Sequence, residues 1–120
     1  MDDDEVVLRA FVRAFGRRYE VTSVTSGEAA LQALQGARFD VAVVDFVMPG
    51  MDGIELARRI AASQPELPCV VLTGYPDLQQ IIEARAQGLF VAVLAKPWEE
   101  ADVDHALARA LRSTKPRPPP

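Results

Sequence analysis

Three short, wholly apolar runs lead into polar residues, and this pattern limits the folds open to the chain. Residues 41–44 are followed by Asp45, and residues 69–72 are followed by Thr73. Residues 91–94 are followed by one alanine and then by Lys96. Runs of this length without alternation are typical of strands buried on both faces of a parallel sheet. Open α/β sheets place their chemistry at the carboxyl ends of such strands. An acid at the end of the first run therefore indicates a functional site.

Apolar residues at helical spacing separate these runs. We expect helices over residues 5–15 and 26–34, the second capped by Ser26, and three more later in the chain. The inward-facing residues expected for those three are Ile54, Ala57 and Ala61, then Leu78, Ile81 and Ile82, then Val103, Leu107 and Leu111. We expect Pro76-Asp77 to open the middle one and Gly88 to follow its end. Residues 19–24 contain β-branched residues and predict a further strand. Such alternation predicts a parallel sheet covered by helices on both faces.

The bulk composition is that of one globular domain. We assign residues 1–112 of the 120 to this domain and residues 113–120, which are rich in proline, to a tail or the start of a linker. A net charge of −4 argues against nucleic-acid binding by the domain itself. No apolar stretch approaches the ~20 residues that span a bilayer. A lone cysteine, Cys69, is expected in the core and fits a reducing cytoplasm.

Four motifs together resemble the receiver domain of two-component response regulators. They are the acidic cluster at residues 2–5, the segment DFVMPGMDG at residues 45–53, Thr73-Gly74 and Lys96-Pro97. The resemblance covers residues 2–112, and four motifs in the right order are far more specific than any one of them. It implies a doubly wound, flavodoxin-like sheet of five parallel strands in the order 2-1-3-4-5. It also implies a switch that accepts a phosphoryl group from a histidine kinase or a histidine phosphotransfer protein.

The resemblance assigns a role to each motif. Asp45 would take the phosphoryl group as a carboxylate nucleophile. Lys96 would supply a fixed positive charge, and Thr73 a hydroxyl that can turn toward the new phosphate. The implied Mg²⁺ ligands are Asp3 and Asp45 directly, Asp2 through water, and the backbone carbonyl of Val47. In the family the Lys96-Pro97 bond is commonly cis. The domain would catalyse only its own phosphorylation and dephosphorylation, so it is not a turnover enzyme.

Other interpretations of these residues stay open. The acids at residues 2–5 could form a solvated or helix-capping first turn, and Asp45 could cap the turn that follows it. The whole domain could be a pseudo-receiver, a protein-interaction module that works without phosphorylation. A phosphatase with an aspartate nucleophile is disfavoured, because such enzymes need a second acid where this chain has Val47. Self-association as a homodimer is left open.

Only Met1 precedes the acidic cluster, where the family has a whole central strand. Loss of that strand would leave buried backbone groups unpaired at ~1–3 kcal/mol each. We therefore expect the first strand to be truncated, through a clipped sequence or a misassigned start. Supply of the strand by a partner chain is the competing explanation.

Two single residues also differ from the family pattern. Val93 stands where the family usually has an aromatic residue, so the relay from Thr73 to the output face is expected to be altered. Val47 cannot orient an attacking water by hydrogen bonding, which predicts a longer-lived phosphorylated state. The sequence names neither the kinase and its signal nor the output partner.

Overall fold

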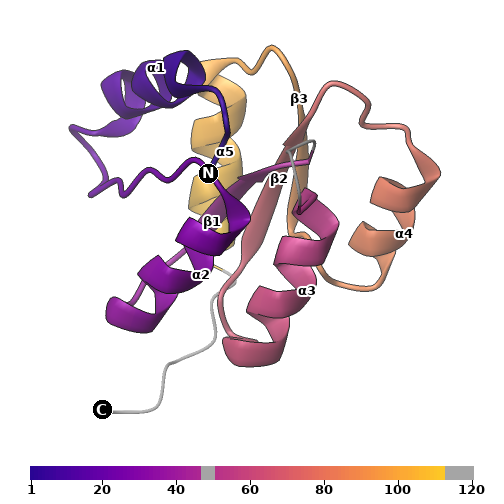
Figure 1. Ribbon diagram of the computed structural model, residues 1–120. Coiled ribbons are helices and arrows are strands. Elements are labelled where there is room, and N and C mark those ends of the chain that lie inside the picture. Colours follow the sequence, from indigo (N-terminus) through magenta and orange to yellow (C-terminus); the bar gives the residue numbers. More distant parts are fainter. Residues whose placement is uncertain (47–50, 113–120) are drawn as a thin grey trace.

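The computed structural model describes residues 1–46 and 51–112, and within them helices and strands alternate almost throughout (Figure 1). The elements are α1 (Glu5–Phe15), α2 (Gly27–Gly36), β1 (Ala42–Asp45), α3 (Gly53–Ser63), β2 (Cys69–Thr73), α4 (Gln79–Ala86), β3 (Ala92–Ala95) and α5 (Glu100–Arg112). No helix in this part of the chain is long and apolar enough to cross a membrane.

The strands form one parallel sheet in the order β1-β2-β3. Helices α2, α3 and α4 pack on one face, while α1 and α5 cover the other (Figure 1). The predicted α/β architecture with a doubly wound parallel sheet is therefore confirmed. The predicted five-strand order is not seen, because the described residues hold three strands, which correspond to the last three of that order.

Residues 19–24 do not form the predicted strand. In place of a ladder, this segment has one backbone bond to the N-terminal residues, in which the amide of Asp2 donates to the carbonyl of Val24 at 3.2 Å. The β-branched residues suit a strand, but a strand needs a neighbour to pair with. Among the described residues, the backbone bonds that connect this segment to β1 run through Met1 and Asp2 alone. We call residues 19–24 the edge segment.

The core centres on β2, in which all five residues are buried. Cys69 belongs to it, as predicted, and burial raises the pKa of its thiol to about 12. Leu56 and Ile60 of α3 and Ile81 of α4 close the core on one face of the sheet. The sheet is therefore held most firmly around its central strand.

Two predicted inward-facing positions on α4 are wrong. The helix begins at Gln79 and not at Pro76-Asp77, so Leu78 is its N-cap and is 40% exposed. Ile82 is 49% exposed, because the buried stripe runs through Ile81 and Ala84, one helical turn apart. The predicted end is confirmed, since Gly88 has a positive φ of 85°.

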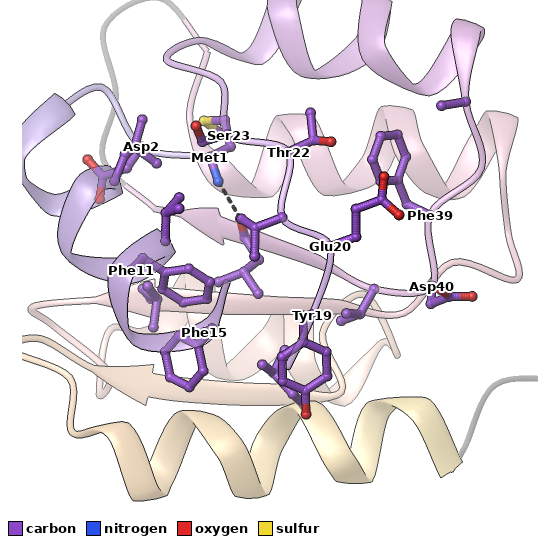
Figure 2. Close-up of a pocket in the computed structure, with 18 of the residues that line it drawn as sticks. Met1, Asp2, Phe11, Phe15, Tyr19, Glu20, Thr22, Ser23, Phe39 and Asp40 are labelled. Atoms are coloured by element: carbon purple, nitrogen blue, oxygen red, sulfur yellow. Dashed lines mark hydrogen bonds between the residues drawn. The ribbon is translucent and has the colours of Figure 1, made fainter. Parts of the chain in front are cut away.

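The predicted inner face of α5 is only partly correct. Val103 and Leu107 are buried, whereas Leu111 is 38% exposed. Leu111 lines a cavity of about 350 Å³ instead of packing in the core. Figure 2 shows this cavity, with Phe11 of α1 and Thr22 of the edge segment among its lining residues. We call it the slot.

Candidate functional site

The predicted site residues lie at one edge of the sheet. Asp45 is the last residue of β1, Thr73 is the last residue of β2, and Lys96 directly follows β3. The strands are parallel and in close register, with Asp45 paired to Leu72 and Thr73 paired to Ala95. Their carboxyl ends therefore meet at the same edge, as in other open α/β sheets.

The N-terminus brings the acidic cluster to the same edge. The amide of Asp45 donates to the carbonyl of Met1 at 3.0 Å, and the Met1 amino group donates to the carbonyl of Val43 at 2.7 Å. These two bonds place Asp2 beside Asp45, and both carboxylates are buried. Met1 thus bonds to β1 as the neighbouring residue of a parallel strand would, at the place where sequence reasoning put the end of the first strand. Burial lowers the pKa of its amino group to about 6.

Three carboxylates converge into a set that suits a divalent cation. Asp2, Asp3 and Asp45 each offer an oxygen atom, and these atoms all lie within 4.8 Å of one another. Asp3 is exposed, while the other two are buried. Hard, compact cations such as Mg²⁺ prefer oxygen ligands and keep waters where protein ligands run out. The donor chemistry therefore fits the predicted metal ion.

Lys96 joins the two buried acids. Its Nζ lies 2.7 Å from Oδ1 of Asp45 and 3.0 Å from Oδ2 of Asp2. Desolvation alone would lower the lysine pKa, but the hydrogen bonds to Asp45 and Asp2 outweigh it and raise the pKa. Desolvation also raises the pKa of Asp45, against the opposing effect of Lys96. The site is thus a cluster of negative charge in which the Lys96 ammonium contacts both buried acids.

The acidic cluster divides between the site and the first helix. Asp4 caps α1, because its side chain accepts from the amides of Val6 at 2.9 Å and Val7 at 3.5 Å. Asp2 in turn accepts from the amide of Asp4 at 2.9 Å through Oδ1. The helix-capping interpretation is therefore correct for Asp4, and it does not account for the position of Asp2.

Thr73 and the residues after it form a tight turn at the site edge. The Thr73 hydroxyl is buried and accepts from the amide of Tyr75 at 3.0 Å. The carbonyl of Thr73 accepts from the amide of Lys96 at 2.9 Å, and the Lys96-Pro97 bond is cis, as the resemblance implied. Tyr75 itself is 65% exposed beside this turn.

The loop after Asp45 is only partly described. The predicted Val47 carbonyl lies outside the described residues. Beyond the gap, Asp52 caps α3 by accepting from the amide of Glu55 at 2.8 Å. The amide of Gly53 donates to the carbonyl of Phe46 at 2.8 Å, so the start of α3 is bonded directly to the end of β1.

Gly53 is a positioning residue that sequence reasoning missed. A Cβ atom there would lie 2.6 Å from the carbonyl oxygen of Asp45 and 2.9 Å from Cα of Phe46. Both neighbours are backbone atoms, so they cannot move aside as a flexible side chain would. The signal in the sequence is the Asp-Gly pair that starts the helix, where glycine permits the close approach.

Comparison with known proteins gives the same class of protein. The family model described as the response regulator receiver domain matches residues 1–108. The transcriptional regulatory protein FixJ of Bradyrhizobium diazoefficiens is 37% identical over 98 residues, which cover 82% of this chain and 47% of that protein. The response regulator receiver protein CpdR of Brucella abortus is 33% identical, with 92% of each chain covered.

Solved structures agree with this match. The signal receiver domain of an HD domain-containing protein from Pseudomonas fluorescens Pf-5 superposes with a TM-score of 0.86 at 31% identity, covering 92% of this chain and 90% of that one. The chain belongs to the response regulator receiver domain family. It spans about half the length of FixJ, and it covers 24% of the DNA-binding transcriptional regulator NtrC of Escherichia coli.

Proposed function

We propose that Asp45 accepts a phosphoryl group from the phosphohistidine of a sensor histidine kinase or a phosphotransfer protein. The observation that carries this proposal is the Lys96 ammonium, which lies within 3.0 Å of both buried acids, Asp2 and Asp45. Phosphoryl transfer needs charge neutralisation and positioning more than covalent help. A nucleophilic carboxylate beside a fixed cation and further acids supplies the necessary groups.

The chemistry requires one bond to form and one to break. A carboxylate oxygen of Asp45 bonds to phosphorus while the bond from phosphorus to the donor nitrogen breaks, and the imidazole keeps the electron pair. Lys96 then balances charge on the phosphoryl oxygens. The Thr73 hydroxyl would exchange its bond with the Tyr75 amide for one to the phosphate, which would convert phosphorylation into a change of conformation.

Mg²⁺ would be held by Asp3 and Asp45 directly, by Asp2 through water and by the Val47 carbonyl, and it would neutralise charge on the transferred group. Residues 1–112 would belong to a receiver domain that works in the cytoplasm and modifies only itself. The DNA-binding activity in the names of relatives such as NtrC would belong to the parts that this chain does not cover.

Labelling with a small phosphodonor tests the proposal. We expect acetyl phosphate to modify the protein only when Mg²⁺ is present, and Asp45→Asn to abolish the modification, as measured by intact mass. Asp52→Asn is the matched control, because Asp52 is an exposed helix cap at the same end of the sheet and asparagine caps equally well. Labelling that survives in Asp45→Asn would refute the assignment. Absence of labelling in the parent would favour the pseudo-receiver.

Val47 would set the lifetime of the phosphorylated state. A valine side chain can neither donate to nor accept from an attacking water, so we expect slow autodephosphorylation. Val47→Asn should release phosphate faster than the parent, and a slower variant would contradict this.

Val93 would leave the output face without the usual aromatic relay, although the site chemistry does not depend on it.

A further inference from the structure

We propose that Trp98 is a positioning residue for the charged site: by packing on α1, it holds Lys96 against Asp2. It acts through the backbone of residues 96–98, which lead from β3 toward α5. Lys96 is the cation beside both buried acids, so the residue that places it determines the geometry of the site. The inference concerns that geometry and stands whether or not Asp45 is phosphorylated.

The contact between Lys96 and Asp2 joins two distant parts of the chain. Nζ of Lys96 lies 3.0 Å from Oδ2 of Asp2, and the two residues are 94 positions apart. A lysine ammonium is a point charge on a flexible four-carbon stem, so it keeps one place only where the backbone beneath it is fixed. The Lys96 side chain is 28% exposed, and burial alone therefore does not fix it.

The Asp2 side of this contact belongs to α1. Asp2 accepts from the amide of Asp4 through Oδ1 at 2.9 Å, and Asp4 caps the helix by accepting from the amide of Val6 at 2.9 Å. The place of the Asp2 carboxylate therefore follows the place of the first turn of α1. A shift of α1 relative to residues 96–98 would separate Asp2 from Lys96.

The Lys96 side is held to the same helix by aromatic packing. The ring of Trp98 lies 5.7 Å from the ring of Phe11, edge to face, and 5.7 Å from the ring of Phe15. Phe11 and Phe15 are one turn apart on α1, with 4.7 Å between their ring centroids (Figure 2). Ring pairs at such distances and angles are favourable beyond the apolar area that they bury. Trp98 is thereby fixed to α1.

The backbone of Lys96 is held between this packing and the end of the sheet. Its amide donates to the carbonyl of Thr73 at 2.9 Å, which fixes the side toward the strands. On the other side a single residue separates Lys96 from Trp98, so the indole cannot shift far without moving the Lys96 backbone. The contacts form a closed chain that runs from Lys96 through Trp98 to α1, and from α1 through Asp2 back to Lys96.

The ion pairs between the end of α1 and α5 are a weaker connection. Arg18 bonds to Asp104 and to Glu100, the latter at 3.2 Å, but its side chain is 47% exposed and salt screens such pairs. Phe15, in contrast, is fully buried, and Trp98 packs against the same cluster of buried residues. The aromatic packing is therefore the contact that holds residues 96–98 against α1.

A double-mutant cycle tests the coupling between Trp98 and Lys96. In the parent we expect Lys96→Ala to lower the folding equilibrium constant about tenfold without Mg²⁺, because both acids lose their cation. In Trp98→Ala the same change should lower it less than about threefold, since Lys96 is no longer held against Asp2. Trp98→Phe keeps a ring and should restore most of the tenfold effect. Chemical denaturation followed by circular dichroism measures each variant.

Leu107→Ala is the control, because it removes buried apolar volume from the same cluster further along α5. In that background Lys96→Ala should still have its tenfold effect, so positioning is separated from general loosening of the cluster. If Trp98→Ala does not fold, Trp98→Leu replaces it in the cycle with the same expectation.

Equal effects of Lys96→Ala in the parent and in the Trp98→Ala or Trp98→Leu background would overturn the proposal. An equal reduction in the Leu107→Ala background would also overturn it, as would a Trp98→Phe background in which the effect stays low. Because the cycle measures unfolding and not phosphorylation, any of these results would leave the assignment of Asp45 untouched.

Discussion

The two edges of β1 differ sharply. On one edge, all four residues pair with β2. On the other, within the described residues, β1 bonds only to Met1, at the end where Asp45 lies. The edge paired with β2 stabilises the core. The other edge positions the acidic cluster through only the two bonds to Met1 among the described residues. Placement of the site and stability of the fold therefore depend on different parts of the same strand.

Hydrogen exchange should show this difference as the largest effect. The amides of β2 lie in a ladder on both sides and in a fully buried strand, so their exchange should require global unfolding. Amides of the edge segment other than those bonded within turns should exchange through local opening. We expect a difference of roughly a thousandfold or more, because a marginal domain of ~5 kcal/mol already protects its core by that factor.

Similar exchange rates in β2 and in the edge segment would contradict this comparison. They would mean that the sheet and the edge segment open together, so that the edge segment has no lower free energy of local opening than β2. Residues of α3 serve as the internal reference, since that helix packs on β1 away from the slot.

Gly53→Ala should break the site end of β1. The added Cβ would press on the backbone at Asp45 and Phe46, which cannot give way, so we expect a loss of about 3 kcal/mol in the free energy of unfolding. Gly36→Ala is the matched control, because a Cβ at that helical position meets nothing within 4 Å. The control should be neutral or more stable by ~0.4–1 kcal/mol. Equal effects in chemical denaturation would show that the close approach is unimportant.

The sequence predicted the part of the fold that depends on local pattern. The buried strands that end at Asp45 and Thr73, and the Ser26 cap of α2, follow from apolar runs and polar punctuation. The strand predicted at residues 19–24 was wrong because pairing is not local: its residues suit a strand, but no strand among the described residues pairs with them. Leu111 was misassigned for the same reason, since the space that it faces is the slot.

The site was predicted as a set of residues but not as a geometry. Nothing in the sequence shows that Lys96 contacts Asp2 as well as Asp45, or that Met1 carries the bonds that bring Asp2 into place. Those facts depend on the crossover connections of a parallel sheet, which bring residues nearly a hundred positions apart into contact. Motif order alone located the residues at the correct strand ends.

Lys96→Ala should have a smaller effect than Gly53→Ala. It leaves Asp2 and Asp45 as buried carboxylates without their cation, and we expect a loss of about 1–2 kcal/mol in the absence of Mg²⁺. The lysine side chain is 28% exposed, which keeps the cost below that of a fully buried pair. Arg59→Ala removes the exposed pair with Glu55 at 3.0 Å and should cost only ~0–0.5 kcal/mol. A Lys96 variant no worse than the Arg59 variant would show that water reaches the acids.

The smallest expected effect is at Arg18, which ties the start of the edge segment to α5. Its guanidinium bonds to Asp104 and to Glu100, the latter at 3.2 Å, and lies 5.5 Å from the centre of the Phe15 ring. The bond to Asp104 raises the arginine pKa, but the group is exposed and its ion pairs are screened by salt. We expect Arg18→Ala to lower the thermal midpoint slightly at low salt, with Arg17→Ala as the neighbouring control.

At high salt the thermal midpoints of Arg18→Ala and Arg17→Ala should become equal. Salt screens the ion pairs of Arg18, and these pairs are the expected source of the difference at low salt. A loss at Arg18 that persists at high salt would mean that its contact with Phe15 matters more than its ion pairs. In that case the edge segment would be anchored by packing on α1 as well as by charge. The contrast between the two edges of β1 would then concern backbone pairing alone.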